Sequence, residues 1–125
     1  MILDTNALSA LADGASGLEA VLRKAARIAV PVIVLGEYRY GISGSRDKKH
    51  YERWLDQYVA RFVILDVDER TAVSYAGVRV SLKKAGMPIP ANDMWIAALC
   101  RQHALPVLSR DRHFDAVSGI QRIDW

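Results

Sequence analysis

Short apolar runs alternate along this chain with longer segments whose apolar residues recur at helical spacing. The runs are too short to form helices, and continuous apolar character of this length is typical of strands buried on both faces of a sheet. Five strands are therefore predicted, at residues 1–3 (MIL), 28–30 (IAV), 62–65 (FVIL), 106–109 (PVLS) and 120–123 (IQRI).

The first two segments between these runs predict helices. Ser16 and Glu19 have the spacing of a capping box, in which each side chain satisfies a backbone N–H of the first turn. The helix that they would begin carries on one face the apolar residues Leu18, Val21, Leu22 and Ala25. Pro31 can start a second helix, running to about Ile42, because a first turn does not need the N–H that proline lacks.

The remaining segments also predict helices. A stripe at helical spacing, which we expect to face the core in part, consists of Tyr51, Trp54, Leu55 and Tyr58. Asp68 can cap a further helix, which Gly86 and Pro88 would end. Its apolar residues are Ala72, Val73, Ala76 and Val80. Residues 92–100 (NDMWIAALC) are apolar on most sides and predict a buried helix.

This alternation of strands and helices indicates an α/β fold, with a central parallel sheet of four to five strands flanked by helices. The sequence contains no internal repeat, low-complexity tract or linker. A chain of this length can bury a sizeable core by itself, so residues 1–125 are predicted to form a single domain.

Composition narrows the class of protein. Hydrophobic residues make up 51% of the chain and charged residues 25%, and no apolar stretch approaches the roughly 20 residues of a membrane span. No basic segment leads into an apolar one at the N-terminus, so no export signal is expected. The single cysteine, Cys100, predicts a buried thiol in a reducing cytoplasm. The net charge of +3 favours an anionic partner only weakly, because 14 acidic residues accompany 17 basic ones.

Acidic residues follow several of the predicted strands. In open parallel sheets, ligands bind beyond the carboxyl ends of the strands, at the point where the strand order reverses. The acids at strand ends are Asp4, Asp66, Asp68 and Asp111, while Glu37 lies on the second long helix and Asp93 opens the buried one. Several of these carboxylates could therefore converge on one edge of the sheet.

Four segments of the sequence resemble the acidic motifs of a known family. They are LDTNALSAL, the GE of PVIVLGEYRYGI, PANDMWIAALC and LSRDRHFDAVSGI. In order and spacing they are similar to the motifs of PIN-domain ribonucleases, above all the VapC-type toxins of bacterial type II toxin–antitoxin systems. The resemblance covers essentially the whole chain and implies a PIN-like three-layer fold.

The resemblance also implies which residues form a site. Asp4, Glu37, Asp93 and Asp111 match the four acids of the family. Three polar residues match positions that support those acids: Thr5, Asn6 and Ser109. Two features depart from the family's pattern. Only three residues precede the first acid, so a start codon further upstream stays open. Ser109 stands where threonine is common.

The implied activity is that of a metal-dependent endoribonuclease. Carboxylates hold Mg²⁺ or Mn²⁺ with several waters retained, and such ions can supply hydroxide and stabilise a leaving alkoxide. Asp4, Asp93 and Asp111 are expected chiefly to bind metal, and Glu37 either to bind metal or to orient the attacking water. The resemblance further implies an RNA substrate, a homodimer in the cytoplasm, no membrane, and an antitoxin received by a groove of the helices around residues 32–60.

Each acid taken singly also has a structural interpretation. Asp4 could precede a helix cap, Asp93 could favour a helix N-terminus through its charge, and Asp111 could cap a turn before Phe114. Glu37 is the most telling, because a carboxylate buried without a partner among its apolar neighbours Val34, Leu35 and Tyr38 would be unfavourable. The acids without a matching motif are interpreted as turn or surface residues: Asp66, Asp68, Asp115 and Asp124.

Basic residues give weaker predictions. Arg110, Arg112 and His113 could contact RNA phosphates, although a solvated surface position is the alternative for His113. Four lysines could also contact backbone phosphates or simply be exposed at helix ends: Lys48, Lys49, Lys83 and Lys84. The three histidines are scattered and do not have the spacing of a metal-ligand set.

Other function classes remain open at this point. A haloacid-dehalogenase-like phosphatase would need a second aspartate two residues after the first, where this chain has Asn6. A receiver domain would need paired acids and a lysine after a late strand, which LSRD does not provide. An inactive PIN-like RNA- or protein-binding module is the main alternative, and retention of all four carboxylates argues against it.

Overall fold

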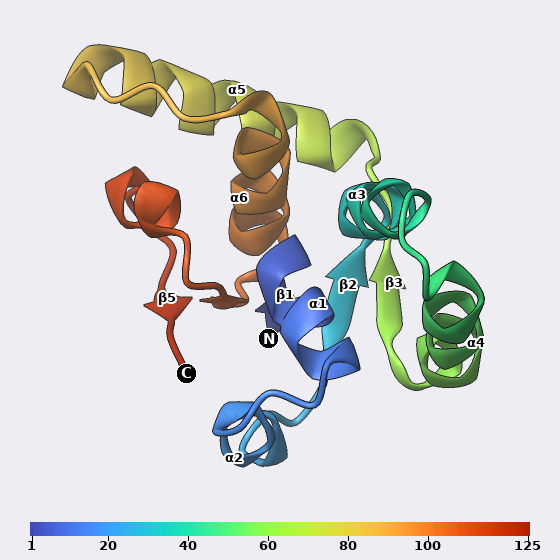
Figure 1. The fold of residues 1–125 in the computed structure, drawn as a ribbon. Helices are drawn as coiled ribbons and strands as arrows, with labels where there is room; N and C mark the ends of the chain where they lie inside the picture. The colour runs from blue at the N-terminus through green and yellow to red at the C-terminus, as the bar shows by residue number, and fades with distance from the viewer.

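The computed structural model describes residues 1–125 and contains one sheet of five parallel strands (Figure 1). The strands are β1 (Ile2–Leu3), β2 (Ala29–Pro31), β3 (Val63–Leu65), β4 (Val107–Leu108) and β5 (Arg122–Ile123). They lie in the order β3-β2-β1-β4-β5. The predicted parallel α/β architecture is confirmed, although each strand is short and the one predicted over 120–123 narrows to its last two residues.

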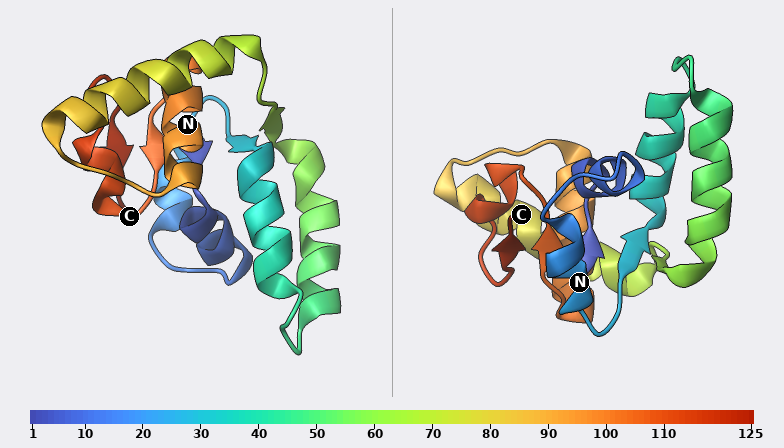
Figure 2. Two further views of the ribbon diagram at one scale, coloured as in Figure 1. Left: turned by 90° about the horizontal axis from the view of Figure 1, so that it is seen from above. Right: turned by 60° about the horizontal axis from the view of Figure 1, so that its bottom comes forward.

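Six α-helices and two 3₁₀-helices connect the strands. They are α1 (Thr5–Ala12), α2 (Leu18–Arg23), α3 (Val32–Ile42), α4 (Lys48–Tyr58), η1 (Val59–Arg61), α5 (Glu69–Ala85), α6 (Ala91–His103) and η2 (Arg112–Ala116). Crossovers between parallel strands are right-handed, so the helices before β3 and those after it fall on opposite faces. Figure 2 shows α5 on the side of the sheet opposite to α3 and α4. None of these helices combines the length and apolar character required to traverse a bilayer.

The strand order reverses beside β1. The chain proceeds from β1 outwards to β2 and β3, then returns to place β4 against the other edge of β1. The carboxyl ends of β1 and β4 therefore flank the position where open parallel sheets bind ligands. Asp4 follows β1 and Ser109 follows β4, so both predicted site residues lie at this reversal.

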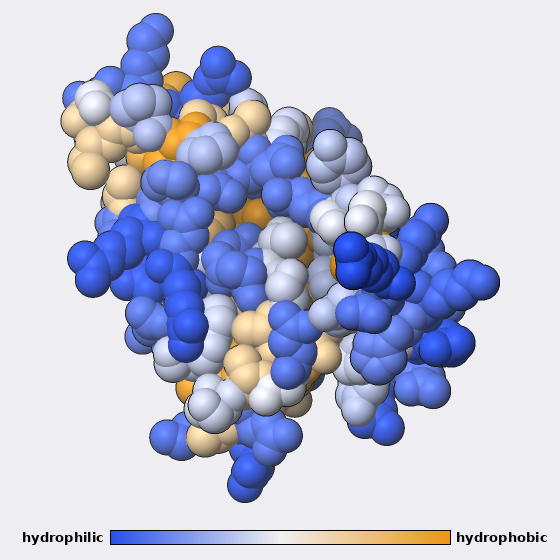
Figure 3. Space-filling model, in the orientation of Figure 1, coloured by the Kyte–Doolittle hydropathy of each residue, from blue (hydrophilic) through white to orange (hydrophobic).

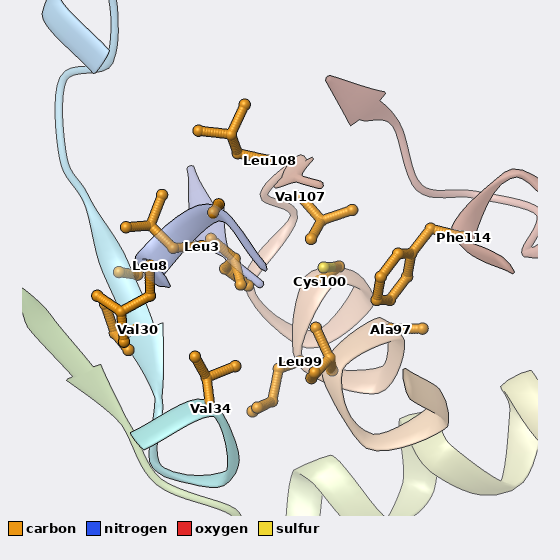
Figure 4. Packing of buried hydrophobic residues seen from close by; sticks show 14 of the residues in the cluster. Leu3, Leu8, Val30, Val34, Ala97, Leu99, Cys100, Val107, Leu108 and Phe114 are labelled. Atoms are coloured by element: carbon orange, nitrogen blue, oxygen red, sulfur yellow. The ribbon is translucent and has the colours of Figure 1, made fainter. Parts of the chain in front are cut away.

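The core lies on both faces of the sheet, as the continuous apolar runs predicted. Ile2, Leu3 and Val30 are completely buried in the central strands. Figure 4 shows Leu8 of α1 on one side of β1 and the α6 residues on the other. Residues 96–100 of α6 are all buried, so this helix is enclosed as predicted. Burial raises the pKa of the Cys100 thiol to about 12, which makes it a packing residue and not a nucleophile.

The capping box predicted at Ser16 and Glu19 is wrong. Gly17 occupies the N-cap position of α2 in a left-handed conformation (φ 84°) and no side chain caps the helix. A left-handed residue suits glycine, and it moves the start of the helix past Ser16. Glu19 pairs instead with Arg23 at 3.4 Å on the exposed surface. The helix ends at Arg23, so Ala25 lies outside it.

The cap predicted for α5 is confirmed. The Asp68 carboxylate accepts a hydrogen bond from the Thr71 backbone N–H at 3.0 Å, and the Asp68 N–H donates to the Thr71 hydroxyl at 3.0 Å. Gly86 ends the helix in the left-handed region with φ 65°. The same Asp68 carboxylate accepts a hydrogen bond from Gln102 at 3.0 Å, which ties the start of α5 to α6.

The apolar residues from which α5 was predicted do not form its packed face. Val73 is 73% exposed and Val80 is 53% exposed. The buried residues of this helix are Thr71, Val78 and Leu82. Figure 3 shows hydrophobic residues at the surface at the upper left, where Figure 1 places the end of α5, and hydrophilic residues over α4 at the right.

Candidate metal centre

Asp4 is the most constrained acid of the molecule. It is the N-cap of α1, and its Oδ1 accepts a hydrogen bond from the Thr5 backbone N–H at 2.7 Å. Its Oδ2 accepts hydrogen bonds from the Ser109 hydroxyl at 2.7 Å and from the Asn6 amide at 2.9 Å. Burial raises the pKa of Asp4 above its ordinary value, against the opposing effect of these hydrogen bonds. Asp4 is therefore the helix cap itself, and it does not merely precede the cap as the structural interpretation had it.

Ser109 joins the ends of β1 and β4. Its hydroxyl donates to Asp4 and accepts from the Asn6 amide at 3.1 Å and from the Asp111 backbone N–H at 2.9 Å. One donor and two acceptor sites are all that a hydroxyl offers, so this fully buried side chain is completely satisfied. The predicted support of the acids by Asn6 and Ser109 therefore has a geometric basis.

Arg122 stabilises the backbone at Ser109, where β4 ends, and the sequence did not predict this role. Its Nη1 donates to the Ser109 backbone carbonyl at 3.0 Å. Its guanidinium also pairs with Asp115 at 2.8 Å and with Asp124 at 3.3 Å. These two acids were interpreted as surface residues, and they are exposed, but they orient an arginine whose side chain is only 14% exposed.

Glu37 approaches the site from α3. Its Oε1 accepts a hydrogen bond from the Thr5 hydroxyl at 3.2 Å, which links α3 to the first turn of α1. Glu37 is half-buried and has Thr5 as a partner, so it is not the unpaired buried carboxylate that would be unfavourable among Val34, Leu35 and Tyr38. Successive residues of a helix point in different directions, and Glu37 faces α1 while Val34 and Tyr38 face the core.

Asp93, Asp111 and His113 form the third part of the site. His113 Nδ1 lies 3.0 Å from Asp93 Oδ2 and 3.0 Å from Asp111 Oδ1. One ligand atom from each of the three residues lies within 4.8 Å of the others, so together they could hold a metal ion. The Asp93 side chain is 13% exposed, that of Asp111 33% and that of His113 49%. The group is therefore open to solvent on the histidine side.

The histidine in this group was missed as a ligand. The three histidines are far apart in the sequence and have no metal-ligand spacing among themselves. His113 instead meets Asp93, which lies 20 residues away on α6. The Asp-x-His spacing of Asp111 and His113 is the one local signal that could have indicated it, because it places an imidazole beside a carboxylate at the start of η2.

A single hydrogen-bond network links the four predicted acids. Glu37 connects through Thr5 to Asp4, Asp4 through Ser109 to Asp111, and Asp111 through His113 to Asp93. Asp66, which has no matching motif, is exposed and takes no part in it. Residues from the start of α1, from α3, from α6 and from the β4–η2 turn are therefore brought together at the reversal of strand order.

The basic residues predicted to contact RNA divide into two groups. Arg110 packs over the Trp125 ring at 4.4 Å and donates to the Trp125 backbone oxygen at 3.0 Å, so it is engaged within the chain. Arg112 is exposed beside the site. The four lysines at helix ends are exposed as predicted.

The donor set suits a divalent cation. Burial raises the pKa of Asp93, and the nearby charges of Asp4 and Asp111 raise it further, while the His113 hydrogen bond lowers it. Without a cation these carboxylates are held together against their mutual repulsion. Carboxylate oxygens are the ligands that Mg²⁺ and Mn²⁺ prefer, and imidazole is a further ligand for transition metals. The residues present therefore fit a metal centre.

The pKa shifts of this group predict how stability depends on pH in chelator. Asp4 and Asp93 have folded pKa values above 3.8, so the fold favours their protonated forms. Their stabilising contribution is complete below 3.8 and is lost as pH rises through the raised pKa. The pKa of His113 is raised above 6.5, chiefly by its hydrogen bond with Asp93. His113 therefore also stabilises the fold more at lower pH, and its contribution is lost as the pH rises through the raised pKa.

We therefore expect the melting temperature in chelator to rise when the pH falls from about 8 to about 4. Two effects oppose this rise. Burial lowers the pKa of the Met1 amino group, which opposes protonation as the pH falls below about 8. The lowered pKa values of Asp68, Asp115 and Asp124 withdraw stability as the pH approaches and passes their ordinary value of 3.8. Differential scanning fluorimetry across this range measures the trend. A double variant Asp4→Asn/Asp93→Asn should flatten it, and an equal slope in that variant would contradict the assignment.

A cleft leads away from the site between α1, α3 and α4. Its volume is about 270 Å³. It is lined by Thr5, Ser9, Asp13, Glu37, Tyr38, Gly41, Ile42, Ser45 and Tyr51. At the far end the Tyr51 hydroxyl donates to Asp13 at 2.8 Å, whereas the Tyr38 hydroxyl is buried and has no hydrogen-bond partner. Because buried hydroxyls normally find one, the cleft has an unused polar group along its wall.

Comparison with known proteins establishes the family. Residues 1–120 match the family described as PIN domain, a span that contains all four acids of the network. The chain is a PIN domain. The haloacid-dehalogenase-like and receiver alternatives are thereby excluded, and the resemblance inferred from the four motifs is confirmed.

This PIN domain is similar to known toxins along nearly all of its length. It is 31% identical over 125 residues to Ribonuclease VapC5 of Mycobacterium tuberculosis, with 98% of the chain and 91% of that protein covered. The crystal structure of VapBC2 from Rickettsia felis bound to a promoter DNA fragment matches it with a TM-score of 0.89 at 25% identity, covering 99% and 97% of the two chains. VapBC-5 of M. tuberculosis, a member of the VapBC family of toxin–antitoxin systems, matches with a TM-score of 0.78 at 28% identity, covering 99% and 97%. The PIN domain is thus related to VapC ribonuclease toxins.

Proposed function

We propose that this PIN domain is a Mg²⁺- or Mn²⁺-dependent endoribonuclease and the toxin of a type II toxin–antitoxin pair. The observation that carries the proposal is the single hydrogen-bond network that joins Asp4, Glu37, Asp93 and Asp111 at the strand reversal. Its relationship to VapC ribonucleases supports the same activity. An inactive binding module would have no need of four converging carboxylates, whose repulsion is unfavourable to the fold.

The residues divide the chemistry of phosphodiester hydrolysis among them. Asp4, Asp93 and Asp111 would hold the cation, which would supply a lowered pKa for water and a positive charge beside the phosphate and the leaving oxygen. Glu37 is hydrogen-bonded by Thr5 at 3.2 Å, half-exposed and separate from the Asp93–Asp111 pair. That position suits a carboxylate that accepts a proton from the attacking water.

The RNA phosphates are bound by basic residues that border the site. Arg112 is exposed next to Asp111 and free to reach a phosphate, whereas Arg110 already stacks on Trp125. We therefore assign the larger part to Arg112 and a positioning role to Arg110. Contacts with the phosphate backbone orient a nucleic acid without reading its sequence.

The antitoxin is proposed to occupy the cleft between α1, α3 and α4. The cleft begins at Glu37, so an inserted segment with a basic side chain would meet the carboxylates and compete with the cation. The homodimer and the cytoplasmic location expected from the resemblance stay predictions, and sedimentation of the purified chain tests the first.

Cleavage of RNA by the purified protein tests the proposed activity. We expect cleavage with Mg²⁺ or Mn²⁺ and none in excess chelator, because the donor set is built for a cation. Glu37→Gln should lower the rate by about 100-fold, the usual contribution of a general base. On expression alone the wild type should arrest growth and this variant should not.

Asp66→Asn is the matched control, since Asp66 is an exposed acid outside the network. Full cleavage in chelator would exclude the metal-dependent mechanism. RNA binding without any cleavage under all metal conditions would support the inactive module instead.

A further inference from the structure

His113 is the one nitrogen donor in a site otherwise made of carboxylates. Its Nδ1 lies 3.0 Å from both Asp93 Oδ2 and Asp111 Oδ1. Its position is fixed locally, because the His113 backbone N–H donates to Asp111 Oδ1 at 2.9 Å at the start of η2. Phe114, the next residue, is buried in the core and anchors this short helix. The imidazole is thereby held at the carboxylates by the fold.

We propose that His113 is a nitrogen ligand of the bound cation and that it makes this site prefer Mn²⁺ to Mg²⁺. The proposal rests on the proposed function, since it concerns the same metal centre. It assigns to His113 a different role from the phosphate contact predicted from sequence.

The spacing of the donor atoms supports this assignment. Neighbouring ligands of an octahedral ion at about 2.1 Å lie about 3.0 Å apart. Nδ1 stands at this separation from one oxygen of each of two carboxylates, which are themselves 18 residues apart in the chain. Both contacts exist in the structure, so the imidazole already lies where a shared cation would need it.

The chemistry of the donor decides which ion is favoured. Mg²⁺ binds almost wholly through oxygen and retains its waters, so it gains little from an imidazole. Mn²⁺ is a first-row transition-metal ion, a series whose affinity for nitrogen-containing sites is lowest at Mn²⁺ and rises along the row, whereas Mg²⁺ lies outside this series. An imidazole added to the carboxylates of this site should therefore separate Mn²⁺ from Mg²⁺ more strongly than the carboxylates alone.

Electron spin echo envelope modulation of Mn²⁺ bound to the purified protein tests the ligand directly. We expect modulation from a directly coordinated ¹⁴N in the wild type and its loss in His113→Gln. His103→Gln is the matched control, because His103 lies at the opposite end of α6 from Asp93 and should leave the signal unchanged. Bound Mn²⁺ without nitrogen modulation in the wild type would overturn the proposal.

Calorimetric titration with each metal alone tests the preference. We expect His113→Gln to weaken Mn²⁺ binding at least about tenfold, the lower range of effects for groups that support a metal ligand, and to change Mg²⁺ binding far less. Equal losses for both ions would overturn the Mn²⁺ preference. Failure of the wild type to bind either ion would remove the proposed function as well, whereas binding and cleavage without nitrogen coordination would leave that function intact.

Discussion

Replacing Asp93 by asparagine is expected to abolish RNA cleavage while leaving the metal-free protein at least as stable as the wild type. Asp93 is largely buried, and its pKa is raised by burial and by the charges of Asp4 and Asp111. The ionised form is therefore unfavourable in the fold, and interactions between close like charges amount to a few kcal/mol at an intermediate dielectric. Asparagine removes the charge and keeps the shape, so the melting temperature in chelator should stay equal or rise.

The same substitution removes a ligand of the cation. We expect cleavage to fall by more than about 100-fold, since even indirect support of a metal ligand has effects approaching that size. Most of the stabilisation that Mg²⁺ or Mn²⁺ gives to the wild type should disappear. Thermal melting of wild type, Asp93→Asn and Asp66→Asn, each with chelator and with metal, measures both effects beside a cleavage assay.

Asp66→Asn should behave as the wild type in all of these measurements. If Asp93→Asn cleaves RNA and responds to metal as the wild type does, Asp93 only contributes a favourable charge to the first turn of α6. The four-carboxylate site would then be wrong.

Ser109→Ala is expected to damage stability and activity together. Its hydroxyl makes hydrogen bonds with Asp4, Asn6 and the Asp111 N–H, and it is fully buried. Alanine leaves these partners without the hydroxyl in a place that water does not reach. The loss should be about 1–3 kcal/mol of unfolding free energy, the range for buried groups left unsatisfied.

The expected loss of cleavage for Ser109→Ala is at least about tenfold, because the positions of Asp4 and Asp111 both depend on this hydroxyl. Chemical denaturation and the cleavage assay measure the two effects. Ser109→Thr keeps the hydroxyl and is the control that should retain most activity. If alanine and threonine were equally active, the hydroxyl would have no positioning role.

Local sequence patterns predicted much of the fold. Residues 28–30 and 62–65 are recognisable as strands because burial on both faces leaves no polar position within them. Asp68 is recognisable as a cap because its partner Thr71 is three residues away. Asp4 is predictable as a site residue because a carboxylate directly after a strand must lie at the carboxyl edge of the sheet.

Local patterns failed where a neighbouring turn or helix decided the outcome. Gly17, in a left-handed conformation, displaced the cap predicted at Ser16. The packed face of α5 was decided by where α6 lies, so Val78 is buried while Val73, equally apolar, is exposed. Hydrophobicity identifies residues that can be buried. The apolar residues of α5 lie on several sides of the helix, so their pattern does not indicate which side packs against the core.

The sequence by itself determined the alternation of strands and helices, the parallel sheet and the acids at its edge, because each depends on residues close together in the chain. Only the tertiary structure decided that His113 lies against Asp93 and that Arg122 supports Ser109. These pairs come from different elements, and neither partner carries a pattern that indicates the other. Their contact exists because the sheet brings the ends of β1 and β4 together and the η2 turn and α6 close over that edge.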